Sequence, residues 1–180
     1  MPRTSLIWRA DFAGNLADGW DANGKVEPHD ERSKVRAAGS MDTTIADFAS
    51  FVAGFARGEG ITPKSRAEML TPQVAITTPR QFPTFMDATS EAMKAIGLSA
   101  GLGVILFEGP RGRGFFKGGH NDTTGNQVIC VEKGRRCVLY LSNDVRAESL
   151  YQRLTEATVG DPGMPWSWEG YTPYDQPRPK

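Results

Sequence analysis

Apolar residues recur every three or four positions in an early stretch of the chain, which is the spacing of one face of an α-helix. They are Ile45, Phe48, Phe51, Val52 and Phe55. Thr43-Thr44 supplies an N-cap oxygen ahead of them, and Gly58 ends the pattern. Thr62-Pro63 then opens a second, shorter helix, because proline is well placed at the first helical position. The pattern predicts helical structure over residues 43–71.

After Gly97 the period changes, and apolar runs around turn residues, the later ones rich in Val, Ile, Leu, Tyr and Cys, indicate β-strands. Two hairpins are expected, one pairing Leu98–Phe107 with Gly112–Lys117 and the other pairing Gln127–Glu132 with Arg136–Ser142. Together they form an antiparallel meander over residues 97–143. Asp144 is a favourable N-cap for a C-terminal helix over residues 144–158. Its predicted buried face consists of Val145, Leu150, Leu154 and Ala157.

The rest of the chain shows no regular period. Residues 1–40 carry turn signals without an apolar face and are expected to be irregular, and residues 72–88 read as a loop. The aromatic tail at 165–171 is expected to pack onto the fold. The order of helices, antiparallel strands and a final helix predicts an α+β class, with an antiparallel sheet and flanking helices, in a single domain over 1–180.

Composition narrows the functional classes. Lys plus Arg equals Asp plus Glu at 21 each, so no overall field attracts nucleic acid or an anionic membrane. The sequence has neither a membrane-spanning apolar run nor a signal peptide, and the compartment is left open. Cys130 and Cys137 lack a His partner for a metal site. If the second hairpin loop has two or four residues, they face each other, and we expect free, buried thiols.

The stretch from Phe115 to Asn126 carries the most chemistry. A strand ends in Lys117, two glycines allow close approach to the backbone, and polar side chains follow. A cation beside exposed backbone N–H groups suits a carboxylate or an oxyanion. The alternative is an ordinary glycine-rich turn with a solvated lysine. Arg111 and Arg113 join Lys117 in a basic cluster that suits phosphate contact or a solvated hairpin end.

Several motifs occur in an order that resembles the β-lactamase-related serine hydrolases, a family that includes class C β-lactamases, D-aminopeptidases and family VIII carboxylesterases. The motifs are Gly101-Leu102-Gly103, Lys117-Gly118-Gly119, Asn121 with Gly125, and the strand end Leu141-Ser142-Asn143. The similarity covers most of the chain. It implies a partial β-lactamase/transpeptidase-like fold and the C-terminal portion of such a domain.

The resemblance also implies roles for individual residues. In this family a serine of an S-x-x-K motif attacks an ester, amide or lactam carbonyl of a small molecule, without a cofactor. Lys117 would be the catalytic electrostatic element, the backbone N–H of His120 would be the oxyanion donor, and Gly118, Gly119 and Asn121 would bind substrate. Gly118 stands where the family usually has Thr or Ser, which favours an ester or peptide substrate over a lactam.

The nucleophile itself is missing, since no serine in the sequence has a lysine three positions later. We therefore expect a truncated hydrolase that is inactive on its own. The rival hypothesis is a non-catalytic binding or assembly module that retains an anion pocket at Lys117. In the resembled fold, strands from the chain's beginning pair with the strand here at Arg136–Ser142. Without them its open edge would favour a homodimer, unless Leu6-Ile7-Trp8 or the aromatic tail covers it.

Overall fold

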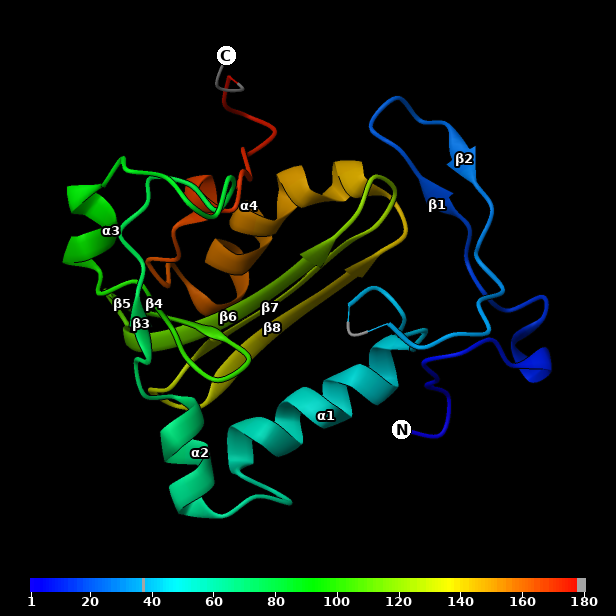
Figure 1. Cartoon of the computed structure of the whole chain (residues 1–180), viewed down its shortest axis with the longest axis horizontal. Helices are drawn as coiled ribbons and strands as arrows, with labels where there is room; N and C mark the ends of the chain where they lie inside the picture. Colours follow the sequence, from blue (N-terminus) through cyan, green and yellow to red (C-terminus); the bar gives the residue numbers. More distant parts are fainter. Residues whose placement is uncertain (37, 178–180) are drawn as a thin grey trace.

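The protein is built around a six-stranded antiparallel sheet with the strands in the order β3-β4-β5-β6-β7-β8. A computed structural model describes residues 1–36 and 38–177 (Figure 1). The strands are β3 (Val74–Ala75), β4 (Ser99–Ala100), β5 (Ile105–Gly109), β6 (Gly112–His120), β7 (Gly125–Val131) and β8 (Arg136–Ser142). Each strand pairs antiparallel with its neighbour, which confirms the predicted α+β class with an antiparallel sheet and flanking helices.

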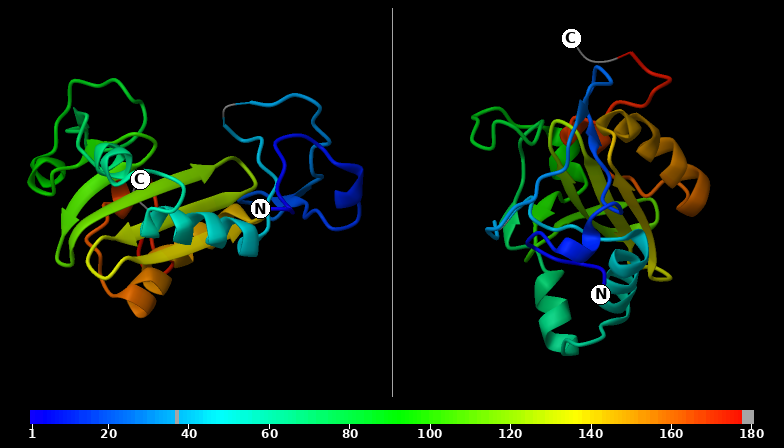
Figure 2. Two further views of the ribbon diagram at one scale, coloured as in Figure 1. Left: turned by 90° about the horizontal axis from the view of Figure 1, so that it is seen from below. Right: turned by 90° about the vertical axis from the view of Figure 1, so that its right-hand side faces the viewer.

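Helices cover both faces of this sheet (Figure 2). Helices α1 (Ile45–Arg57) and α2 (Pro63–Met69) lie on one face, and α4 (Glu148–Val159) lies on the other. The short 3-10 helix η3 (Trp166–Trp168) packs on the α4 face, and α3 (Glu91–Ala95) lies beside the short strands. We call the two sides the α1 face and the α4 face.

Alternation along β6 and β7 divides the core into two clusters. Phe115 and Val128 point to the α1 face, where they meet Val52, Leu70, Leu106 and Cys130. Phe116 and Ile129 point to the α4 face, where they meet Leu98, Phe107, Tyr151, Met164, Trp166, Trp168 and Tyr171. The last three of these residues come from the aromatic tail, so its predicted packing is confirmed. Burying one such side chain contributes about 2 kcal/mol, and the tail is therefore a major part of the core.

The predicted helices form, but their buried faces differ from expectation. Helix α1 begins after Thr44, whose side chain accepts a hydrogen bond from the Asp47 N–H, as predicted. Two members of its apolar stripe, Ile45 and Phe51, are nevertheless more than half exposed. In α4 the predicted face is wrong: Leu150, Leu154 and Ala157 are exposed, Val145 is half-buried, and Tyr151 and Thr155 are buried instead. A 3-10 turn, η2 (Val145–Ala147), precedes α4. Tyr151 stacks on Tyr140 of β8 and Thr155 hydrogen-bonds to the Tyr140 hydroxyl, so contacts with the sheet select this face.

The strand prediction needs a correction at its start. The expected strand Leu98–Phe107 is broken into β4 and β5 by a turn at 101–104. Gly103 has a φ of 86°, and a Cβ on Gly101 would lie 2.5 Å from the Met69 carbonyl oxygen, so this turn depends on glycine. The stretch read as a loop holds β3. Residues 1–40 contain η1 (Ala10–Phe12) and a small hairpin of β1 (Gly19–Trp20) and β2 (Val26–Glu27).

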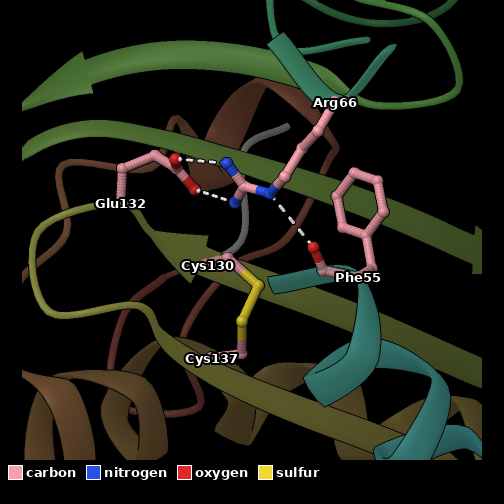
Figure 3. The surroundings of a disulfide bond; sticks show 5 residues. All are labelled: Phe55, Arg66, Cys130, Glu132 and Cys137. Carbon is pink, nitrogen blue, oxygen red and sulfur yellow. Dashed lines mark hydrogen bonds and ion pairs between the residues drawn. A yellow bond between two sulfur atoms is a disulfide. The ribbon is translucent and has the colours of Figure 1, made fainter. Parts of the chain in front are cut away.

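The two cysteines form a disulfide, so the expectation of free thiols is wrong (Figure 3). Cys130 and Cys137 are directly opposite in the β7–β8 register, with a Cα–Cα distance of 4.1 Å. The loop between the strands has four residues, 132–135, which is one of the lengths that brings the cysteines face to face. A close, non-hydrogen-bonded cross-strand pair places two sulfur atoms within bonding reach. The bond joins the two strands near the turn of their hairpin, one residue pair from the loop.

An arginine beside the disulfide ties three elements together (Figure 3). Arg66 of α2 donates two hydrogen bonds to the Glu132 carboxylate, at 3.0 and 2.8 Å, and a third, at 3.1 Å, to the Phe55 carbonyl at the end of α1. The arginine and Glu132 side chains are both largely buried. A bidentate Arg–carboxylate pair is directional. Together with the bond to Phe55, it fixes α1, α2 and the β7–β8 hairpin relative to one another.

β8 is the last strand of the sheet. Among the described residues it pairs only with β7, and no strand covers its outer edge at 137–141. Leu6 and Ile7 are exposed, and the aromatic tail packs on the α4 face, so neither of the two segments considered as covers pairs with this edge. No helix in the described ranges has the length and apolar character needed to cross a membrane.

Candidate functional site

The predicted site lies at the end of β6, where this strand extends beyond its neighbour β5. The β5–β6 ladder covers Gly112–Phe116, whereas the β6–β7 ladder continues to His120. Residues 117–120 are therefore paired with β7 on one side and lie beyond β5 on the other. This open edge lies at the end of β6 that leads into the β6–β7 turn (Figure 1).

The ladder decides which backbone groups face the open edge. The Asn121 N–H donates to the Thr124 carbonyl at 3.0 Å, and the Glu132 N–H donates to the Arg113 carbonyl at 2.9 Å. These bonds place the odd-numbered residues of β6 in hydrogen-bonded pairs with β7. The N–H and C=O groups of Gly118 and His120 consequently point toward the open edge. Exposed Lys117 donates from Nζ to the Gly118 carbonyl at 3.0 Å, which brings its charge close to this backbone.

The two glycines of the motif have opposite surroundings. A Cβ added to Gly119 would meet nothing within 4 Å, so neither packing nor a positive φ requires glycine there. A Cβ added to Gly118 would lie 2.5 Å from Glu169 Oε1 and 2.9 Å from Gln127 Oε1. The α4 face beneath Gly118 is therefore filled. This explains why a threonine or serine does not fit at position 118.

The groups beneath Gly118 are a buried amide and a buried acid. Gln127 is 1% exposed, and its Nε2 donates to Glu169 Oε2 at 2.5 Å. Gln127 Oε1 is buried without a partner among the described residues. Burial raises the pKa of Glu169 to about 7, although Gln127 and the Lys117 charge act in the opposite direction. When Glu169 is protonated, its O–H can donate a hydrogen bond to Gln127 Oε1. The acid and the amide would then be joined by two hydrogen bonds, one in each direction.

A second acid holds the His120 side chain on the same face. His120 Nδ1 lies 3.2 Å from Glu148 Oε1, at the start of α4. Burial raises the pKa of the Glu148 carboxyl, and His120 lowers it to a smaller extent. The neighbouring Tyr171 is buried, and burial together with the nearby carboxylates raises the pKa of its hydroxyl. The imidazole is thus held on the α4 face, while the His120 N–H faces the open edge.

Asn121 supports the turn that ends the site. Its Oδ1 accepts hydrogen bonds from the Thr123 and Thr124 N–H groups, at 2.9 and 2.7 Å, and from both threonine hydroxyls. This leaves its amide nitrogen as the group that can contact a ligand. The five residues singled out in the sequence are consecutive, and the structure places them at the end of β6 and the start of the β6–β7 turn. Sequence reasoning missed Gln127, Glu148 and Glu169, because they belong to no local motif and meet only through the fold.

Comparison with known proteins supports the fold alone. No protein-family model matches this sequence, and no curated protein matches it. Among solved structures, it is similar to the octameric penicillin-binding protein homologue from Pyrococcus abyssi, with a TM-score of 0.63 and 13% sequence identity. The match covers 94% of this chain and 36% of that protein, so the chain spans about a third of its length. The architecture is therefore of the penicillin-binding-protein/β-lactamase type.

Proposed function

We propose that this chain is part of a β-lactamase-like serine hydrolase that cleaves an ester or amide bond of a small molecule through an acyl-enzyme. Its contribution is the edge at residues 117–120, where the substrate lies against the backbone and its developing oxyanion accepts a hydrogen bond from the His120 N–H. Lys117 supplies the positive charge, and the amide of Asn121 contacts the substrate. The nucleophilic serine is not in this chain, which we expect to be inactive by itself.

The open edge of β6 is the observation that carries this proposal. Two backbone N–H groups, at Gly118 and His120, point to the side where β5 has ended, and the Lys117 ammonium lies beside them. Fixed N–H donors beside a cation stabilise a developing oxyanion more effectively than water does, because they need no reorganisation. Gly119 adds access, since nothing in the protein occupies the space beside it.

Binding by the isolated chain tests the site. N-acetylglycine carries a carboxylate and an amide, and its binding can be followed by amide chemical-shift changes. We expect shifts centred on residues 117–121, and Lys117→Gln should weaken binding about fivefold, in line with loss of one partly exposed charge contact. The matched control is Lys25→Gln in the β1–β2 turn, which should bind like the unmodified protein. Shifts spread over the surface, or equal affinity in both variants, would refute the site.

Activity tests the missing nucleophile. The 180-residue chain should not hydrolyse nitrocefin or p-nitrophenyl esters above background, and a fluorophosphonate probe should label no serine. Stoichiometric labelling of one serine would overturn the proposal. Coding DNA upstream of Met1 separates the two hypotheses: in-frame S-x-x-K and Y-x-N motifs support the hydrolase, whereas an immediate stop codon supports a binding module.

We also propose self-association of the isolated chain through β8. The observation behind it is the edge at 137–141, which has no strand partner among the described residues. A second copy could add its own β8 and continue the sheet. This surface is separate from the β6 edge, so a dimer of this kind would leave Lys117 accessible.

A further inference from the structure

A cationic cavity lies at the other end of β6, away from Lys117. Its volume is about 630 Å³, within the range of small-molecule sites. Three segments supply its walls: the β5–β6 turn with Arg111, the β7–β8 hairpin with Lys133 and Arg136, and the loop after α4 with Asp161. With a rise of about 3.3 Å per residue, six steps along β6 separate this end from Gly118 by about 20 Å. The cavity is therefore distinct from the proposed hydrolase site.

The positive charge of this cavity is only partly neutralised from within the protein. Arg111, Lys133 and Arg136 make no salt bridge or side-chain hydrogen bond with any residue in the described ranges. The nearby carboxylates are already engaged: Glu108 with Arg113, and Glu132 with Arg66. Asp161, in the cavity wall, accepts a hydrogen bond from the neutral Gly163 N–H at 2.8 Å and keeps its negative charge, so the lining side chains carry a net charge of about +2. A protein with zero formal net charge thus concentrates unpaired cations in one hollow.

The cavity walls are held in place before any ligand binds. The Cys130–Cys137 disulfide closes the hairpin that carries Lys133 and Arg136, and Cys137 directly follows Arg136. The Arg111 guanidinium lies against the backbone of Gly160, where a Cβ would be 2.0 Å from one of its nitrogen atoms. Fixing a binding group in advance reduces the entropy lost on binding. The hairpin backbone that carries Lys133 and Arg136 is therefore fixed before a ligand binds, while the three cationic side chains themselves are exposed.

We propose that this cavity binds a small phosphorylated molecule with at least two phosphate groups. Arginine presents a planar fork that matches phosphate oxygens, and lysine adds a compact point charge. Three cations from two segments around one hollow suit two adjacent phosphates better than a single anion. Because the cavity is remote from residues 117–120, this site is independent of the proposed hydrolase function.

Calorimetric titration of the full chain with diphosphate tests the proposal, with chloride used to match ionic strength. We expect a single site that binds diphosphate at least tenfold more tightly than inorganic phosphate or sulfate. Arg111→Gln and Lys133→Gln should each weaken diphosphate binding about fivefold or more. Lys25→Gln changes the net charge equally and should leave the affinity unchanged, because Lys25 lies between β1 and β2, a hairpin well away from β5 and the start of β6 (Figure 1).

Three outcomes would overturn the proposal. They are no binding at matched ionic strength, equal affinity for all the anions, or equal losses in the Lys133 and Lys25 variants. Amide shifts give an independent check, because bound diphosphate should move the signals of residues 110–111 and 133–136. If the shifts instead centre on 117–121, diphosphate binds at the β6 edge and the cavity is not the site. Circular dichroism of each variant confirms that the exposed substitutions leave the fold intact.

Discussion

The two faces of the sheet differ most sharply at two adjacent residues of β6. Gly118 points to the α4 face, where Glu169 and Gln127 already occupy the position of a side chain, whereas Gly119 points to open space on the α1 face. The same residue type thus answers two different requirements. At 118 the protein itself requires glycine, and at 119 the vacant space leaves room for a ligand. A glycine in a motif acquires its meaning only when the neighbours on its own face are known.

Substitutions at the two glycines should have the most unequal effects. Gly118→Thr restores the residue usual in the resembled family, but it must displace Glu169 or Gln127, and we expect a loss of about 3 kcal/mol in the free energy of unfolding. Gly119→Ala should cost less than about 0.5 kcal/mol. Urea unfolding of both variants gives the comparison. Equal losses would show that the α4 face is not crowded beneath Gly118.

The α1 face depends on a covalent link. Cys130 belongs to its core cluster, and the disulfide closes a loop of about eight residues, for which the entropy model gives about 2.5 kcal/mol. The double variant Cys130→Ala/Cys137→Ala should lose about this much stability. Unmodified protein treated with a reducing agent keeps both sulfur atoms and serves as the control, since it separates the cross-link from packing. Mass spectrometry after alkylation should add no alkyl group to the unreduced chain.

The α4 face depends on protonation. In the folded state the pKa of Glu169 is raised to about 7 from an ordinary value near 4.5, so the folded protein binds this proton more tightly than the unfolded chain. The stabilising contribution is complete below pH 4.5 and is lost as the pH rises to 7, which amounts to about 2 kcal/mol after allowance for partial exposure.

The variant Glu169→Gln isolates this contribution. An amide at 169 can both donate to and accept from Gln127, as the protonated acid does, but it cannot lose a proton in this range. The fall in unfolding free energy between pH 4.5 and 7 should therefore be about 2 kcal/mol smaller than in the unmodified protein. Glu91→Gln, on the surface of α3, is the matched control. The pH dependence of stability that arises from Glu148 should persist in both variants. If the unfolding free energy of Glu169→Gln fell with pH as steeply as that of the unmodified protein, the raised pKa of Glu169 would be contradicted.

Local chemistry explains which features could be predicted from the sequence. Thr44 and Thr62 act as N-caps through contacts within three residues, and the pairing of β7 with β8 follows from two apolar runs around the Lys133-Gly134 turn. The buried face of α4 could not be predicted, because it is set by contacts of Tyr151 and Thr155 with Tyr140 in the neighbouring sheet. The surroundings of Gly118 come from positions 127 and 169, which are joined only by strand pairing and the folded tail. A motif can identify Lys117, but it cannot reveal what lies beneath the next residue.

A substitution on the outer edge of β8 should have a modest effect on the free energy of unfolding and a clear effect on self-association. The β7–β8 ladder pairs Cys130 with Cys137 as a close pair, so the odd-numbered residues of β8 direct their N–H and C=O groups outward. Leu139 and Leu141 are therefore the outward-facing backbone positions at the centre of this edge. Beside them, a groove of about 240 Å³ between α1 and β8 is lined by apolar side chains that include Val52 and Leu139.

A charge on this edge should block pairing with a second copy, because pairing two edge strands would bury the charge of the lysine. We expect the unmodified chain to show a concentration-dependent dimer by light scattering. Leu141→Lys should shift the dissociation constant at least tenfold toward monomer. Because Leu141 is half-buried, we expect a loss of about 1 kcal/mol in unfolding free energy. Leu150→Lys makes the same change on the exposed side of α4 and should leave the dimer intact. A stable monomer at all concentrations, with slowly exchanging amides at 137, 139 and 141, would mean that this edge is already protected within one molecule.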